Sequence, residues 1–246
     1  MPLHPRDPAQ PEDLGLATPP GGPQYRAYVG PPYDYDLVAA MTFGLLTILG
    51  LRQQHRVLDV GCGSLRIGRL LLPYLNRGCY AGLEPNAWLV EDGIRREVGQ
   101  DQIDIKQPRF VISDDATPLL DDGCRYDYVV AQSIFSHTGP DLLDRWIGQI
   151  GALLSPQGVL VATYLPDEVD NTTPGWIYPD CVAYRYDTLA GTAREHGLDC
   201  VQLDWRHPRQ RWVLMAKPGF ETDWLERGGL SWNTAFDRLN ARGQHG

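Results

Sequence analysis

Apolar and polar positions alternate along the chain in two rhythms, and the order of these rhythms predicts the fold. Short apolar runs of strand length lie at residues 57–60, 79–83, 109–112, 126–131 and 158–164. Segments with apolar residues three and four positions apart, the spacing of an amphipathic helix, lie between them at residues 66–75, 87–98 and 140–154. Strands that alternate with helices in this way predict a mostly parallel sheet with helices on both faces.

The pattern changes on both sides of this alternating core. Residues 33–50 and 187–196 have the apolar spacing of helices. Two further apolar runs, 200–205 and 211–216, are separated by a short turn and indicate a β-hairpin. The aromatic segment 165–186 has no clear period, and a loop of this length inside a compact domain is more often functional than idle.

Composition sets the expected limits of the domain. Residues 1–24 are rich in proline and poor in clustered apolar side chains, so they cannot offset the entropy of ordering, and we predict a mobile tail. Residues 25–217 form the predicted domain, and residues 218–246 form a weakly specified C-terminal extension. A chain of 246 residues with 43% hydrophobic residues is long enough for one domain with a sizeable core.

Charge and cysteine content exclude several classes of function. The net charge is −9, and no block of Lys or Arg is present, so we expect no nucleic-acid partner. The five cysteines show no C-x-x-C spacing, which argues against a disulfide framework, and we expect no metal site. No apolar run approaches the roughly 20 residues that would span a bilayer, so we predict a cytoplasmic protein without a membrane partner. No oligomeric state is indicated.

The most informative motif follows the first predicted strand. Asp59-Val60-Gly61-Cys62-Gly63 closes the run, and Glu84 ends the next strand about 20 residues later, the spacing that places a carboxylate on a ribose. A dinucleotide fingerprint would require glycine at the position that Arg66 occupies. The acidic Asp59 favours a cationic ligand instead, and S-adenosylmethionine carries a sulfonium and an ammonium group but no phosphate.

The chain resembles the class I S-adenosylmethionine-dependent methyltransferases over about residues 25–217. Val57 to Gly63 is similar to their first motif, although Leu65 stands where the family commonly has a third glycine. The Gly-Cys-Gly-Ser-Leu-Arg run and the lead-in from Tyr28 to Pro32 resemble a bacterial subgroup of mostly unassigned substrate. The resemblance implies an α/β, Rossmann-like doubly wound sheet of seven strands, the last antiparallel, with an N-terminal helical cap, and S-adenosylmethionine as cofactor.

Candidate cofactor-binding residues lie on the expected loops at the carboxyl ends of the strands. Arg66 is a candidate for the methionine carboxylate of the donor. The resemblance implies that a side chain after the third strand binds the adenine, and either aspartate there could instead cap a turn. The candidates are Tyr28, Asp59, Gly61, Cys62, Gly63, Arg66, Glu84, Pro85, Asn86, Asp114, Asp115, Gln132 and Ser133.

Methyl transfer is an in-line displacement, so the protein mainly aligns the reactants and excludes water. If the acceptor is protonated, His137 is the first candidate base and Tyr164 the second, although both residue types often serve only packing. Trp176, Tyr178 and His207 are candidates for contact with the acceptor. We expect transfer to an oxygen or nitrogen of a small molecule. The alternatives are a catalytically silent donor-binding regulatory or scaffold protein, and a non-methylating enzyme that uses the bound cation.

Overall fold

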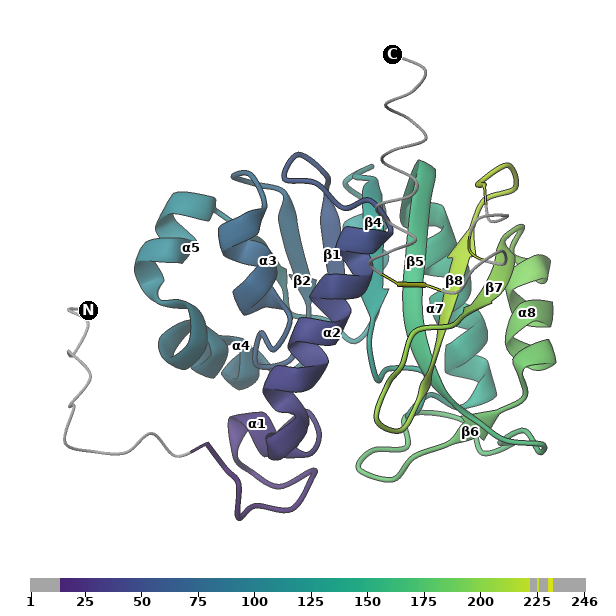
Figure 1. The fold of residues 1–246 in the computed structure, drawn as a ribbon, viewed down its shortest axis with the longest axis horizontal. Coiled ribbons are helices and arrows are strands. Elements are labelled where there is room, and N and C mark those ends of the chain that lie inside the picture. Colours follow the sequence, from purple (N-terminus) through teal and green to yellow (C-terminus); the bar gives the residue numbers. More distant parts are fainter. Residues whose placement is uncertain (1–13, 222–224, 226–229, 232–246) are drawn as a thin grey trace.

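The computed structural model describes residues 14–221, 225, 230 and 231, and it contains one sheet between two layers of helices (Figure 1). The order of the strands across the sheet is β3-β2-β1-β4-β5-β8-β7, and the short β6 pairs with β5 off this path. In chain order the strands are β1 (Val57–Val60), β2 (Tyr80–Leu83), β3 (Arg109–Val111), β4 (Tyr126–Ala131), β5 (Leu154–Pro166), β6 (Ala183–Tyr184), β7 (Asp199–Leu203) and β8 (Arg211–Ala216).

The helices alternate with these strands along the chain. They are α1 (Tyr25–Tyr28), the 3₁₀ turn η1 (Pro32–Asp34), α2 (Tyr35–Ile48), α3 (Gly68–Tyr74), α4 (Ala87–Gly93), the π-helical turn η2 (Ile94–Val98), α5 (Gln100–Lys106), α6 (Thr117–Leu120), α7 (Pro140–Leu153) and α8 (Tyr186–Glu195). In the described part of the chain, the helices are all too short or too polar to cross a membrane.

The central strands are apolar on both sides because helices cover both faces of the sheet. Every residue of β1 and of β2 is buried, as expected for strands of a parallel sheet. The first strand pairs in parallel with β2 on one side and β4 on the other. Only β8 runs antiparallel to its neighbours β5 and β7. The predicted doubly wound fold with an antiparallel last strand is therefore confirmed.

Two hydrophobic cores lie on the two faces of the sheet. Helices α6, α7 and α8 cover one face, where Leu143 and Ile150 of α7 pack against Leu160 of β5. Helices α2 and α3 cover the other, where Leu45 and Leu71 lie in the same buried cluster as Trp212. The apolar stripes predicted from the sequence are the sides of the helices that pack against these two faces of the sheet. Hydrophobic periodicity therefore located the main helices correctly.

The structure adds elements that the sequence pattern did not predict. The segment expected to be one long loop, 165–186, contains β6, which is only two residues long and pairs with the extended end of β5. Helix α5 follows Gly99, whose φ of 91° separates it from η2. None of the seven residues of α5 is buried, so no apolar stripe marks it in the sequence.

The predicted tail and extension differ in part from expectation. Residues 14–24 form turns that are tied to the domain, because Gly21 N–H donates to the carbonyl of Ala27 and the Gln24 side chain caps α1. The N-terminal cap therefore begins earlier than the predicted boundary at residue 25. Most of the predicted extension 218–246 lies outside the described residues, but Leu225 and Leu230 are buried in the α2 and α3 core.

Candidate active site

The loop after β1 turns sharply at two glycines. Gly61 and Gly63 have φ values of 65° and 53°, which favour glycine. Side chains from elsewhere lie directly over both. A Cβ atom built on Gly63 would be 2.6 Å from Cγ1 of Val29, and one on Gly61 would collide with Ile134. Leu65, at the position of the family's third glycine, also adopts a positive φ of 61° and is fully buried.

Glu84 directly follows β2 and holds this loop in place. One carboxylate oxygen accepts the N–H of Gly63 at 3.1 Å, and the other accepts the backbone and side-chain N–H groups of Asn86 at 2.9 and 2.7 Å. Burial raises the pKa of Glu84, and these hydrogen bonds oppose the shift. The carboxylate is thus held rigidly beside the loop at the carboxyl edge of the sheet.

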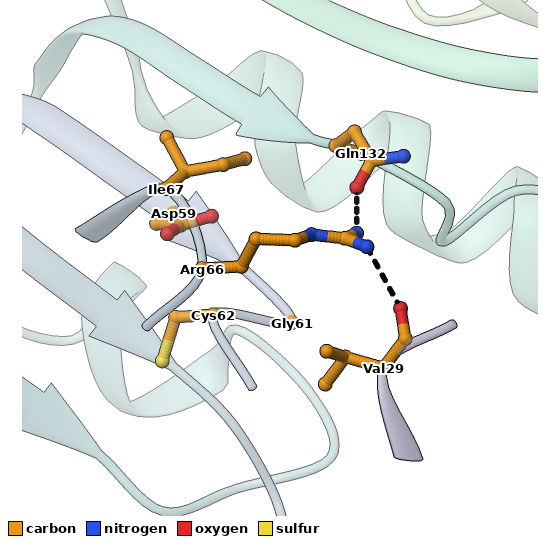
Figure 2. Close-up of a pocket in the computed structure, with 7 residues that line it drawn as sticks. All are labelled: Val29, Asp59, Gly61, Cys62, Arg66, Ile67 and Gln132. Atoms are coloured by element: carbon orange, nitrogen blue, oxygen red, sulfur yellow. Dashed lines mark hydrogen bonds between the residues drawn. The ribbon is translucent and has the colours of Figure 1, made fainter. Parts of the chain in front are cut away.

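A pocket of about 250 Å³ lies against the loop (Figure 2). Arg66 extends along it, donating a hydrogen bond to the carbonyl of Val29 at 2.9 Å and another to the side-chain oxygen of Gln132. The arginine therefore connects the N-terminal cap to the end of β4. The lining residues are Val29, Asp59, Gly61, Cys62, Arg66, Ile67 and Gln132.

Opposite charges face this pocket without a direct salt bridge between them. Burial raises the pKa of Asp59 to about 7, although its carboxylate accepts the hydroxyl of Tyr80 at 2.9 Å. Burial lowers the pKa of Arg66 to about 10. Burial also raises the pKa of the Cys62 thiol, so this cysteine lines the pocket in its uncharged form. A ligand group that carries both an ammonium and a carboxylate would match the two charges.

Aromatic side chains from three segments meet beside the loop. The rings of Tyr28 and Tyr178 are 5.0 Å apart, and the hydroxyl of Tyr178 donates to the carbonyl of Tyr28. The ring centroids of Trp88 in α4 and Tyr28 are 5.2 Å apart, and those of Trp176 and His137 are 5.6 Å apart. The N-terminal cap and the segment 165–186 are therefore joined directly across this edge.

His137 follows β4 and belongs to the same aromatic group. Its ring lies 5.3 Å from that of Tyr178, and its Nδ1 is 2.8 Å from the carbonyl oxygen of Asp180. A carbonyl can only accept, so Nδ1 carries the proton and Nε2 is free to accept one. Burial lowers the pKa of His137, which keeps the ring neutral at pH 7.

The turn between β7 and β8 reaches back to the end of β4. Nε2 of His207 lies 3.3 Å from Nε2 of Gln132. Gln210 donates to the hydroxyl of Ser133 at 2.9 Å, and Ser133 N–H donates to Thr163 at 2.7 Å. The predicted residues Gln132, Ser133 and His207 are thus brought together, although they come from distant parts of the sequence.

Other predicted residues lie apart from the pocket. The hydroxyl of Tyr164 donates to Gln202 at 2.8 Å, and the ring is buried in the core beneath α7 and α8, on the opposite face from Trp212. Tyr164 is therefore placed for packing and not for proton transfer at the pocket. Asp115 accepts the N–H of Thr117 at 2.9 Å, which is the turn-capping alternative. Asp114 and Pro85 are exposed.

Sequence reasoning missed the apolar side chains that cover the glycines. Val29 lies within the Tyr-Val-Gly-Pro-Pro segment, from which only Tyr28 was selected because of its hydroxyl. Ile134 lies between two predicted site residues, and Gln210 lies in the predicted hairpin turn. Ile67, a further lining residue, belongs to the loop before α3. The segments that contain these residues were predicted, but nothing in the sequence indicates that their side chains meet at the glycine loop or the pocket.

Comparisons with known proteins agree with this geometry. Residues 58–160, which run from β1 into β5, match the family model described as a methyltransferase domain. Solved structures with the same fold include magnesium protoporphyrin IX methyltransferase (ChlM) from Synechocystis PCC 6803 with bound SAH, at 15% identity and a TM-score of 0.55. That alignment covers 76% of this chain and 84% of that protein.

Two further structures show the same arrangement. The CcbJ methyltransferase from Streptomyces caelestis is 17% identical, with a TM-score of 0.56 and coverage of 76% of this chain and 97% of that protein. The glycopeptide N-methyltransferase MtfA, complexed with SAH, is 13% identical, with a TM-score of 0.52 and coverage of 72% and 87%. The predicted resemblance is confirmed at this level: residues 58–160 match a methyltransferase domain, and the fold is that of solved methyltransferases, two of which contain bound SAH.

Proposed function

We propose that the protein transfers a methyl group from S-adenosylmethionine to an oxygen or nitrogen of a small molecule. The observation that carries this proposal is the combination at one edge of the sheet. A two-glycine loop is fastened by Glu84, and Asp59 and Arg66 face a single pocket beside it. Ligands of open α/β sheets bind at this edge, next to the point where the strand order reverses, here between β1 and β4.

The residues fit the chemistry of the donor. The cradle of Gly61 and Gly63 allows close approach of a ligand, and Glu84 is positioned to accept hydrogen bonds from a ribose. Asp59 and Arg66 match the ammonium and carboxylate of an amino-acid group. Val29 and Ile134 lie directly over the two loop glycines, so both side chains must shift when the donor enters.

The donor supplies an electrophilic methyl group on a sulfonium sulfur when it is bound. The protein's own residues would enclose the reaction, because Tyr28 and Tyr178 join the cap to the segment 165–186 over the loop. Neutral His137, with Nε2 unprotonated, would receive a proton from an O–H or N–H acceptor. His137 is therefore our candidate general base, in preference to Tyr164.

The described surroundings favour a small acceptor. Aromatic rings from the cap, α4 and the segment 165–186 gather at the loop edge, which favours contact with a small organic acceptor. Two solved neighbours, a magnesium protoporphyrin IX methyltransferase and a glycopeptide N-methyltransferase, are named for a porphyrin and a glycopeptide, which supports an acceptor of this class.

Calorimetry tests the proposal directly. S-adenosylmethionine and S-adenosylhomocysteine should bind, whereas NAD should not. The matched variants are Gly63→Ala and Gly78→Ala, because both glycines have positive φ values but a Cβ on Gly78 would meet nothing within 4 Å. Gly63→Ala should lose donor binding and Gly78→Ala should keep it. Binding of NAD in place of the methyl donor would refute the proposal.

A further inference from the structure

Gln132 lies between two groups that both donate hydrogen bonds. On one side, Nη2 of Arg66 donates to Oε1 of Gln132. On the other side, Nε2 of His207 lies 3.3 Å from Nε2 of Gln132. The Gln132 side chain is buried, so water does not freely replace a missing partner. What these groups can do together depends on the tautomer of the histidine.

The tautomer of His207 follows from its other ring nitrogen. Nδ1 accepts the backbone N–H of Gln210 at 3.0 Å and that of Arg209 at 3.2 Å, so it carries no proton. Burial, followed by the charges of Arg66 and Arg209, lowers the pKa of His207 to about 4, so the ring is neutral at pH 7. A neutral ring without a proton on Nδ1 must carry it on Nε2, which faces Gln132.

The cluster therefore has one more donor than it has acceptors. The amide of Gln132 has a single oxygen, and this oxygen can serve either Arg66 or His207. Turning the amide over only moves the unmatched donor from one side to the other. In the arrangement present, two donor nitrogens are 3.3 Å apart without an acceptor between them, and an oxygen atom beside this contact could accept from both at about 2.9 Å.

The surrounding charge favours an anionic oxygen. Arg66 is buried, and its two hydrogen-bond partners, Val29 and Gln132, are neutral. Arg209 lies near His207 and pairs with Asp34 at 2.6 Å. The remaining carboxyl group on this side, Asp59, has its pKa raised by burial. Donors that converge in a buried, positively charged setting are the usual elements of an oxyanion site.

We propose that the Nε2–H groups of Gln132 and His207 bind one carboxylate oxygen of the methyl acceptor, with Arg66 holding Gln132 in place. His207 then serves as a neutral donor that orients the acceptor and not as a base. The site lies on the β7–β8 turn and the end of β4, on the other side of β1 from Glu84, and is therefore assigned to the acceptor. This assignment rests on the proposed function, because it presupposes a methyl acceptor.

The first test uses the full chain, labelled with ¹⁵N-histidine and saturated with S-adenosylhomocysteine. His207→Phe identifies the ring signals of His207. We expect the Nε2–H tautomer, and a shift of that signal on titration with sodium acetate at constant ionic strength. Acetamide, the neutral analogue, should bind about tenfold more weakly. An Nδ1–H tautomer, or the absence of an acetate response, would overturn the proposal.

Control ligands distinguish the source of the oxygen. S-adenosylhomocysteine has a carboxylate, whereas 5′-methylthioadenosine lacks the amino-acid group. If S-adenosylhomocysteine alone shifts the His207 signal and then blocks acetate, the oxygen belongs to the donor and the acceptor assignment is wrong. If calorimetry shows no binding of S-adenosylhomocysteine, the proposed function fails, and the acetate titration of the free protein still tests the pair of donors.

A substitution tests the excess of donors independently. Gln132→Glu places a carboxylate where both Arg66 and His207 can donate to it, so it should raise the Tm by about 2–4 °C and abolish the acetate response. Gln54→Glu adds the same charge at an exposed position outside the cluster and serves as the control. A fall in Tm for Gln132→Glu, or an equal rise for both variants, would contradict the proposal.

Discussion

The buried carboxylate of Asp59 should have opposite effects on stability and on the proposed binding of the donor. Its pKa rises from 3.8 to about 7 through burial, so the native state binds more protons than the unfolded state between these pH values. Stability must therefore fall as the pH rises from about 4 to about 7. Asp59→Asn should remove this loss and stabilise the free protein at pH 8 by about 2–4 kcal/mol, while weakening donor binding.

Urea unfolding at pH 4 and pH 8 measures this effect for the variant and the unchanged protein. The stability difference should be largest at pH 8 and should nearly vanish at pH 4. The hydroxyl of Tyr80 can still donate to the oxygen of an asparagine at position 59, so this contact is preserved. Equal stability of the two proteins at pH 8 would show that the carboxyl group is not penalised by burial.

Glu84 acts on the donor and on the loop at once. Glu84→Ala should weaken binding of S-adenosylhomocysteine by about 1.5–3 kcal/mol, because hydrogen bonds to a charged group are lost. Part of the loss should come from the loop, since Glu84 also accepts the N–H of Gly63. Calorimetry measures the change, and Glu91→Ala, at an exposed position of α4, is the control. Unchanged affinity in a folded Glu84→Ala protein would remove Glu84 from the donor site.

The proton-transfer role of His137 predicts a distinct pH profile. A base acts in its neutral form, so turnover should fall as the pH drops through the pKa of His137, which burial holds below 6.5. His137→Ala should lower kcat by about 10²- to 10⁴-fold and abolish this acidic limb, with little change in donor affinity. Equal losses in kcat and donor affinity would indicate that His137 only packs against the ligand.

At the scale of elements, the N-terminal cap depends on one buried ionic network. Helix α1 has four residues and is too short to be stable alone. Arg26 pairs with Glu97 of η2 at 2.6 Å, and the hydroxyl of Tyr25 donates to the same carboxylate at 2.8 Å. This network fixes Tyr28 and Val29, which follow directly in the chain and cover the glycine loop.

Removing one partner of this ion pair should destabilise the protein because the other charge stays buried without compensation. Glu97→Ala leaves Arg26 without its main partner and should destabilise the protein by about 3 kcal/mol. The double variant with Arg26→Ala should be less destabilised than the sum of the two single variants. A double-mutant cycle from urea unfolding measures the coupling. Additive losses would mean that the pair does not hold α1 in place.

At the scale of the whole molecule, donor binding should be coupled to global stability. The site is assembled from the cap, the loops after β1, β2 and β4, and the β7–β8 turn, so only the folded chain can bind. S-adenosylhomocysteine at 100 times its Kd should add about 2.7 kcal/mol and raise the Tm by about 5–11 °C. A thermal scan against ligand concentration measures this, and a Tm that does not change would contradict donor binding.

The sequence by itself determined the doubly wound sheet and the two-glycine loop after β1. Both depend on local sequence. The hydrophobic period of a strand or helix is visible within its own segment, and the motif from Asp59 to Gly63 lies with Glu84 in one βαβ unit. The limits of β1 and β4 were predicted correctly for this reason. Elements without a hydrophobic stripe of adequate length, such as β6 and α5, left no such signal.

Only the tertiary structure decided which side chains meet at the site. Val29 reaches Gly63, and His207 reaches Gln132, across separations of the chain that no local pattern encodes. Tyr164 shows the same limit in reverse. The strand was expected to end at Tyr164, but β5 continues to Pro166, and the pleat turns the Tyr164 ring into the opposite core. Chemical character is a property of a residue type, whereas the direction of a side chain and its neighbours are set by packing of the complete chain.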